Sequence, residues 1–182
     1  MDIRYKIEFF SNWHCGSGLA AGADVDALVV KDAKGLPYVP GRTIKGLLRE
    51  AASELYSDSV LINKIFGLSG DVKPAKPGDS RIATSFFGNA TLPEGAAIFS
   101  ANLAPHLFQT FASTRIDENS GMAKDNSLRK IETVVPCTLE GVIKNVPDEG
   151  EEVLRKAMQM VKRMGTGRNR GYGRCSISPV SK

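Results

Sequence analysis

Two stretches of this sequence repeat apolar residues at helical spacing, and strand-like segments lie before, between and after them. The first helical stretch runs from about 43 to 56, and Thr43 is its expected N-cap. The second runs from about 149 to 164, and Gly165 is the expected residue at which it ends. Strand-like patterns occupy the segments 3–10, 27–32, 81–92, 96–103, 131–143 and 172–180.

The order strand, helix, strands, helix, strand predicts an α+β fold. The simplest arrangement is a ferredoxin-like sandwich, in which an antiparallel sheet carries two helices on one face and loop insertions. A chain of 182 residues is expected to form a single domain over 1–182. The segment 67–80 predicts an exposed loop, because it is rich in glycine, proline and charge. The polar segment 113–130 predicts a long protruding loop, and loops of that length are usually functional.

The composition excludes several classes of protein. Three scattered cysteines argue against a disulfide framework and against a cysteine-type zinc site, so a reducing cytoplasm is expected. Two histidines are too few for a multi-histidine metal site. The sequence has no run of membrane-spanning length and no signal-peptide pattern at its start, so no membrane association is expected. The net charge of +4 is only a weak indication of a nucleic-acid partner.

The most distinctive local composition is "GTGRNRGYGR" at residues 165–174. Glycines allow a positive φ and can turn successive backbone N–H groups toward one phosphate-sized concavity. Arginine guanidinium groups match the geometry of phosphate oxygens. A disordered basic tail is the alternative, but a strand-like segment follows and predicts a loop fixed at both ends. Its candidate RNA-binding residues are Gly165, Gly167, Arg168, Arg170, Gly171 and Gly173.

A second basic group lies on the first predicted helix. Arg42, Lys45 and Arg49 are spaced i, i+3 and i+7, which places them on one face. A solvated helix face explains such a stripe as well as a polyanion-binding surface does. Lys162 and Arg163 are expected on the last turn of the second helix, where they would extend the basic surface of the glycine-rich loop.

The acidic candidates precede the apolar segment 27–32. Asp24 and Asp26 are two residues apart, and in extended chain they point to the same side. A carboxylate beside bound RNA can position a divalent cation or orient a 2′-hydroxyl. A turn or capping role is the commoner fate of an aspartate, and Asp32 at the start of the "DAKG" turn fits it. For His14 the sequence favours a structural role or an RNA contact over catalysis.

Several of these motifs together resemble the RAMP superfamily, the RNA-binding proteins of CRISPR systems. "PYVPGRTIKGLLRE" (37–50) resembles its strand-to-helix signature, and "GTGRNRGYGRC" (165–175) resembles its closing glycine-rich loop. "STRIDENSGMAKDNSLRKIETVVPCTLEGVI" (113–143) is similar to its thumb-like loop and the strand that follows. "HCGSG…VDALVVKDAKGLPYVPG" (14–41) is similar to the backbone subunit of type III effector complexes.

The resemblance implies a modified RNA-recognition-motif fold and a CRISPR-associated role in antiviral defence. It implies that the chain binds guide RNA in a multi-subunit type III complex, pairs it with complementary target RNA, and contacts other subunits or repeated copies of itself. By position Asp26 matches the family's cleaving aspartate, with Asp24 as the neighbouring candidate, and cleavage requires Mg²⁺ or another divalent cation near Asp26. The RNA-binding residues carried over are those of the glycine-rich loop together with Arg42, Lys45, Arg49, His14, Arg115 and Arg129.

Three functions remain open at the level of sequence. The first is metal-dependent endoribonuclease activity within the complex, through Asp26. The second is a non-catalytic subunit that only holds RNA. The third is a guide-processing endoribonuclease, which a histidine-poor chain does not obviously support.

Overall fold

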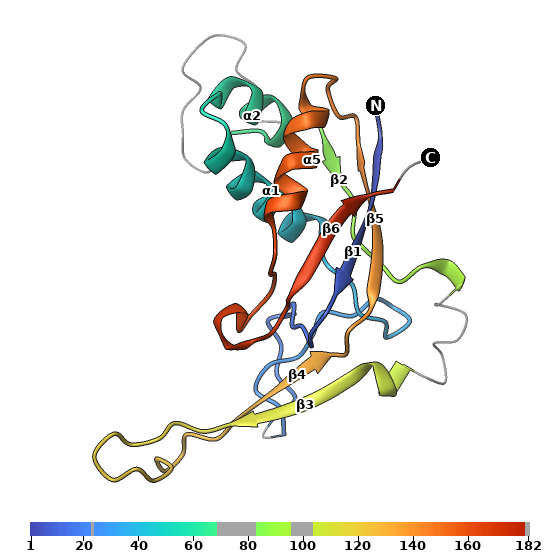
Figure 1. Cartoon of the computed structure of the whole chain (residues 1–182). Helices are drawn as coiled ribbons and strands as arrows, with labels where there is room; N and C mark the ends of the chain where they lie inside the picture. The colour runs from blue at the N-terminus through green and yellow to red at the C-terminus, as the bar shows by residue number, and fades with distance from the viewer. Residues whose placement is uncertain (23, 69–82, 96–103, 181–182) are drawn as a thin grey trace.

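The computed structural model describes residues 1–22, 24–68, 83–95 and 104–180. An antiparallel four-stranded sheet runs through it in the order β2-β5-β1-β6 (Figure 1). Its strands are β1 (Ile3–Phe9), β2 (Phe86–Phe87), β5 (Thr138–Lys144) and β6 (Cys175–Pro179). If the four strands are numbered 1 to 4 along the chain, their order across the sheet is 2-3-1-4. Helices follow the first and the third of them. This arrangement confirms the predicted ferredoxin-like α+β fold.

Among the described residues, three α-helices pack together on the sheet: α1 (Gly41–Leu55), α2 (Ser59–Phe66) and α5 (Gly150–Met160). The prediction contained only two helices, because α2 was not recognised. Its N-cap is Asp58, whose Oδ1 accepts hydrogen bonds from the backbone nitrogens of Val60 at 3.0 Å and Leu61 at 3.1 Å. This cap and three buried side chains, Ile62, Ile65 and Phe66, hold the short helix against the core.

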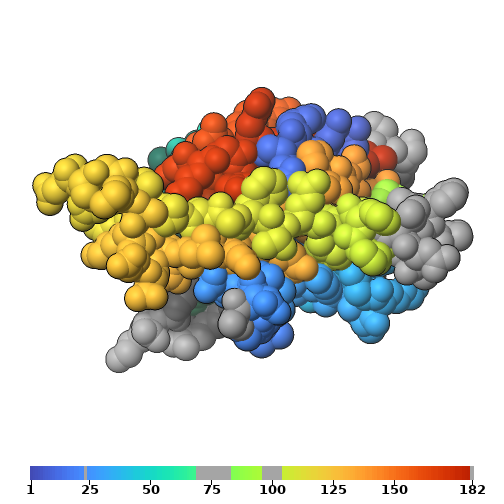
Figure 2. Space-filling view, turned by 90° about the horizontal axis from the view of Figure 1, so that it is seen from below, coloured from blue at the N-terminus to red at the C-terminus, as the bar shows by residue number. Residues whose placement is uncertain are grey.

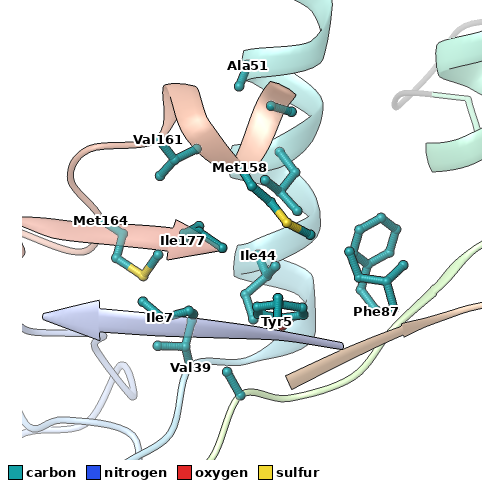
Figure 3. Close-up of a cluster of buried hydrophobic side chains, with 14 of the residues drawn as sticks. Tyr5, Ile7, Val39, Ile44, Ala51, Phe87, Met158, Val161, Met164 and Ile177 are labelled. Atoms are coloured by element: carbon teal, nitrogen blue, oxygen red, sulfur yellow. The ribbon is translucent and has the colours of Figure 1, made fainter. Parts of the chain in front are cut away.

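The core lies between the helices and one face of the sheet. Alternate residues of β1 point into it, and Tyr5 and Ile7 are fully buried. In Figure 3 these side chains meet Ile44 from α1 and Met158 from α5. Gly141 of β5, which pairs with Tyr5, leaves room for the tyrosine ring, because a Cβ there would lie 2.3 Å from the Tyr5 hydroxyl oxygen. One hydrophobic cluster therefore joins the helices to the sheet.

Both long helices differ from the prediction at an end. Thr43 is not the N-cap, because α1 begins at Gly41 after Pro40. The second helix ends at Met160 rather than near residue 164, and Val161 is extended with φ −72° and ψ 110°. Val161 and Met164 are buried as the apolar spacing indicated, but from extended chain, where Arg163 pairs with Arg174. Gly165 therefore does not end the helix, and Lys162 and Arg163 do not lie on its last turn.

Several predicted strands also need correction. Residues 27–32 form isolated bridges to three different segments instead of a strand. The segment 131–143 is divided into β4 (Arg129–Val134) and β5 by the bend around Pro136. Of 81–92, only Phe86–Phe87 is strand, while 96–103 and most of 67–80 lie outside the described residues.

A two-stranded hairpin projects from the sheet. Its strands are β3 (Phe108–Ser113), which the sequence did not indicate, and β4, and a short 3₁₀ helix, Ala104–Leu107, precedes it. The predicted loop 113–130 is the tip of this hairpin, with its ends in the two strands. Figure 1 shows the hairpin extending away from the sheet. No helix in the described ranges has the length and apolar character needed to cross a bilayer.

Candidate nucleic-acid interface

The glycine-rich stretch, residues 165–174, is a fixed loop and not a disordered tail. The backbone nitrogen of Thr166 donates to the His14 carbonyl at 2.9 Å, and that of Gly173 donates to the Asn12 carbonyl at 2.8 Å. Inside the loop, Arg170 N–H donates to the Gly167 carbonyl at 2.8 Å. The guanidinium of Arg163 donates to the Arg168 carbonyl at 2.8 Å. These bonds anchor the loop to residues 10–16, as the prediction of a loop fixed at both ends requires.

Glycine is needed at two points of the loop for close approach. Gly165 has φ +86°, and a Cβ there would lie 2.3 Å from the His14 carbonyl oxygen. Gly173 has φ +67°, and a Cβ there would lie 1.9 Å from the Met164 carbonyl oxygen. Gly171 also has a positive φ, but nothing lies within 4 Å of its Cβ position. At Gly167 a Cβ would lie 2.8 Å from Cδ2 of the Tyr172 ring, so the loop combines two glycines crowded by backbone, one crowded by a side chain and one in open space.

The expected cradle of backbone N–H groups is only partly available. Thr166, Arg170 and Gly173 already donate their N–H groups within the protein, and Arg174 donates its own to Ser11 Oγ at 3.0 Å. The side chains of Arg168, Arg170 and Arg174 are exposed. Contact with a polyanion at this loop therefore depends on guanidinium groups more than on the backbone.

His14 is a buried structural residue. Its side chain is 3% exposed, and its Nδ1 lies 2.6 Å from the Glu132 carbonyl oxygen. Since a carbonyl oxygen only accepts, Nδ1 carries the proton. The main chain of His14 accepts from Thr166, so this residue joins the glycine-rich loop to β4. Its burial favours the structural role over the RNA contact that the sequence also allowed. The neighbouring Trp13 is buried as well, stacked on Phe9 with ring centroids 4.4 Å apart.

Asp26 lies in an exposed loop that is docked on β4. Its backbone nitrogen donates to the Lys130 carbonyl at 2.8 Å, and its carboxylate Oδ2 accepts from the Lys130 nitrogen at 2.7 Å. One carboxylate oxygen thus holds the hairpin, and the other is not part of this contact. Asp24 is also exposed, and in the described ranges its side chain makes no hydrogen bond. Asp32 caps its turn as predicted, accepting from the nitrogens of Lys34 at 2.8 Å and Leu36 at 2.9 Å.

The protein alone supplies little for a cation near Asp26. Within the described part of the chain, no group of three or more His, Cys, Asp or Glu side chains gathers as metal ligands do. Asp26 fits a single-carboxylate contact, and Mg²⁺ commonly completes such a site with phosphate oxygens and water.

The hairpin separates the glycine-rich loop from the Asp26 loop. On the β3 side, Asn12 Nδ2 donates to Gln109 Oε1 at 2.9 Å, and Phe111 meets Tyr172 edge to face with ring centroids 5.8 Å apart. On the β4 side lies the Asp26 loop. Figure 2 shows the hairpin in yellow and orange crossing this end of the molecule, with the red C-terminal region on one side and the blue loop on the other. Arg115 and Arg129, both exposed, lie on the hairpin.

No residue of the basic stripe of α1 lines the hollow between this helix and the glycine-rich loop. The hollow has a volume of about 170 Å³, and its α1 wall carries Glu50 and Glu54 opposite Arg163 and Arg168. Arg49 and Glu50 are separated by roughly 100° around the helix axis. Arg49 instead donates to the Gly67 carbonyl at 2.9 Å and to Asn63 Oδ1 at 3.1 Å. Arg42 is exposed and Lys45 half-buried, and neither lines the hollow.

Sequence reasoning missed Glu132, whose side chain holds the Asp26 loop on β4. Its carboxylate accepts from the Val29 nitrogen at 3.0 Å and from Lys31 Nζ at 2.8 Å. The only sequence signal is a charged residue among β-branched neighbours in a strand, which gives no indication of its partners.

Comparisons with known proteins agree with this architecture. The family model of the RAMP superfamily matches residues 6–176. A subunit in a cryo-EM structure of type III-B Cmr-beta bound to cognate target RNA superposes with a TM-score of 0.78 at 11% identity, covering 98% of this chain and 97% of that one. A subunit in the apo state of Cmr-beta gives a TM-score of 0.74 at 12% identity, with 100% and 98% covered. No curated protein sequence gives a significant match. At these identities the structural likeness shows the fold alone. The family model matches nearly the whole chain, and the chain therefore belongs to the RAMP superfamily.

Proposed function

We propose that this chain is a subunit of a type III CRISPR ribonucleoprotein, which binds guide RNA and its complementary target and cleaves the target through Asp26. The observation that carries the proposal is the position of the β3–β4 hairpin. It lies between the arginine-bearing glycine-rich loop on one side and the loop that carries the exposed Asp26 on the other (Figure 2). A duplex that met the hairpin would then have one strand near the arginines and the other near Asp26.

The surface chemistry supports the binding half of the proposal. Exposed arginines on a loop fixed by backbone hydrogen bonds can contact phosphates at little entropic cost. Such contacts position RNA without reading its sequence, which suits a subunit whose specificity comes from base pairing. The related folds belong to Cmr-beta, one of them bound to cognate target RNA.

Asp26 is the residue to which we assign the chemistry. Its exposed carboxylate is held in place through Oδ2, so its orientation is defined before RNA arrives. Its role would be to hold a divalent cation or to orient a 2′-hydroxyl toward the adjacent phosphate. Mg²⁺, when bound, would neutralise charge that develops on the phosphate, and Asp26 would be its protein ligand. The remaining ligands would be phosphate oxygens and water.

The alternative of a non-catalytic RNA-holding subunit also has an observation in its favour. The hydrogen bond between Asp26 and Lys130 gives the carboxylate a structural task that needs no catalysis. Loss of cleavage on changing Asp26, with RNA binding retained, distinguishes the two functions.

The proposal is tested first by affinity purification of the tagged full-length chain from its own cells. We expect other protein subunits and a short RNA carrying CRISPR repeat sequence to co-purify. Recovery of the chain alone, without RNA, would contradict membership of such a complex. Incubating the purified chain by itself with repeat RNA in a chelator tests the guide-processing function. Cutting at one site under those conditions would replace our assignment.

A further inference from the structure

We propose that Glu132 is a positioning residue that fixes Asp26 by fastening residues 26–31 to the hairpin strand β4. The inference deepens the proposed function and rests on it for the role of Asp26. Glu132 itself is not expected to touch RNA, because its side chain is 13% exposed and both carboxylate oxygens already have partners.

The carboxylate of Glu132 holds the loop at two points. Oε2 accepts from the backbone nitrogen of Val29 at 3.0 Å, and Oε1 pairs with Lys31 Nζ at 2.8 Å. Val29 is 2% exposed, so its N–H would lose its partner in a buried place if the carboxylate were removed. Lys31 is held from a second side, since its Nζ lies 4.0 Å from the centre of the Phe108 ring.

The main chain of Glu132 adds two further connections. Its nitrogen donates to the Ala27 carbonyl at 3.0 Å, next to Asp26. Its carbonyl lies 2.6 Å from Nδ1 of His14, whose own carbonyl accepts from Thr166 of the glycine-rich loop. A single residue of β4 therefore connects the Asp26 loop, the hairpin and the glycine-rich loop.

These contacts explain why the exposed Asp26 keeps a defined place. Residues 27–32 form no strand, and on one side backbone hydrogen bonds join them to residues 15–19, for example from the Val30 nitrogen to the Cys15 carbonyl at 2.8 Å. On the side of β4 the segment is held at Asp26 by Lys130, and by Glu132 through its main chain at Ala27 and its carboxylate at Val29 and Lys31. Without that carboxylate, the part of the segment beyond Ala27 would have no hydrogen bond to β4 within the described residues, and the contacts at Lys130 and Ala27 would have to orient Asp26 against the motion of the loop. Small displacements of a reacting group reduce the rate of chemistry more than they reduce binding.

The test compares Glu132→Ala, Glu132→Gln and Lys31→Met, with Glu140→Ala as the matched control. Glu140 is an exposed carboxylate on β5 that makes no side-chain hydrogen bond within the described residues. Hydrogen exchange is measured on residues 24–31 of the intact chain. Single-turnover cleavage and affinity are measured on the assembled ribonucleoprotein, with a fully complementary target RNA and Mg²⁺.

We expect Glu132→Ala to speed exchange at residues 24–31 and to slow cleavage by about tenfold or more with unchanged target affinity. Glu132→Gln keeps an acceptor for Val29 and should recover part of the rate, Lys31→Met should have a smaller effect, and Glu140→Ala should have none. Unchanged exchange in Glu132→Ala would overturn the inference, and so would faster exchange with a normal cleavage rate. If the wild-type complex does not cleave, the proposed function fails. The exchange measurement then decides by itself whether Glu132 holds the loop.

Discussion

The carboxylate Oδ2 of Asp26 lies 2.7 Å from the backbone nitrogen of Lys130, although the two residues are 104 positions apart in the sequence. The reciprocal bond, from the Asp26 nitrogen to the Lys130 carbonyl, is 2.8 Å long. The main chain and the side chain of Asp26 therefore both attach the candidate catalytic loop to strand β4 of the hairpin.

The two glycines Gly173 and Gly171 provide a matched pair for testing the loop. Both have a positive φ, so alanine costs about 1–2 kcal/mol of left-handed strain at either place. At Gly173 the new Cβ would also meet the Met164 carbonyl. We expect Gly173→Ala to lower the free energy of unfolding clearly more than Gly171→Ala, measured by urea denaturation. Equal losses would show that the described packing at Gly173 is wrong.

Arg168 and Arg170 are expected to contact phosphates and not bases. Changing either to alanine should weaken binding of all RNA sequences to a similar degree. Each change should also reduce the slope of log affinity against log salt by about 0.7–1, because one counterion-releasing contact is lost. Binding of several unrelated RNAs at a series of salt concentrations measures both effects. A loss confined to one RNA sequence would argue for base contact.

Substitution of Arg49 and of Arg42 should affect stability differently, although both residues belong to the predicted stripe. The guanidinium of Arg49 is bonded to Gly67 and Asn63, so Arg49→Ala should cost about 1–3 kcal/mol of stability. Arg42 is exposed, so Arg42→Ala should leave the melting temperature unchanged. If α1 binds RNA, Arg42→Ala should lower the RNA affinity without destabilising the fold, whereas Arg49→Ala should also destabilise the fold. A stability loss at Arg42 as large as that at Arg49 would contradict this assignment.

The three cysteines give a prediction about pH, since Cys15 and Cys175 are buried and Cys137 is half-buried. Burial raises the pKa of Cys15 to about 12 and those of Cys137 and Cys175 to about 11. Unfolded thiols ionise near pH 9, so the folded state binds more protons between that pH and about 11–12. The free energy of unfolding should therefore fall as the pH rises through this window. A thiol reagent at pH 8 should react slowly with the native protein and quickly in urea, and rapid native reaction would contradict the burial.

The sequence predicted the elements in which apolar residues recur at the regular spacing of a strand or a helix. β1 and the two long helices have one face in the core, and their patterns place them correctly. The prediction placed 161–164 in the helix because Val161 and Met164 continue the helical spacing of apolar residues, although extended chain buries them equally well. The strand β3 was missed because nearly all of its residues are exposed, so it carries no alternation. The short α2 has apolar residues on more than one side, which obscures its period.

At the candidate site, single functional residues were easier to predict than the residues that they contact in the folded chain. Asp26 and the arginines of the glycine-rich loop could be named from residue type and motif order. That Arg49 serves α2 and that Glu132 serves the Asp26 loop depends on contacts between residues far apart in the sequence. Residue type and spacing do not encode such pairings.

The most direct test of the account is single-turnover cleavage of a complementary target RNA by the assembled complex containing either Asp26→Ala or Asp24→Ala. We expect Asp26→Ala to abolish Mg²⁺-dependent cleavage while target affinity is retained. Asp24 does not make the contact to β4 that Asp26 makes, so the Asp24→Ala complex should cleave at a rate near that of the wild type. Normal cleavage by the Asp26→Ala complex would contradict the assignment of the chemistry to Asp26.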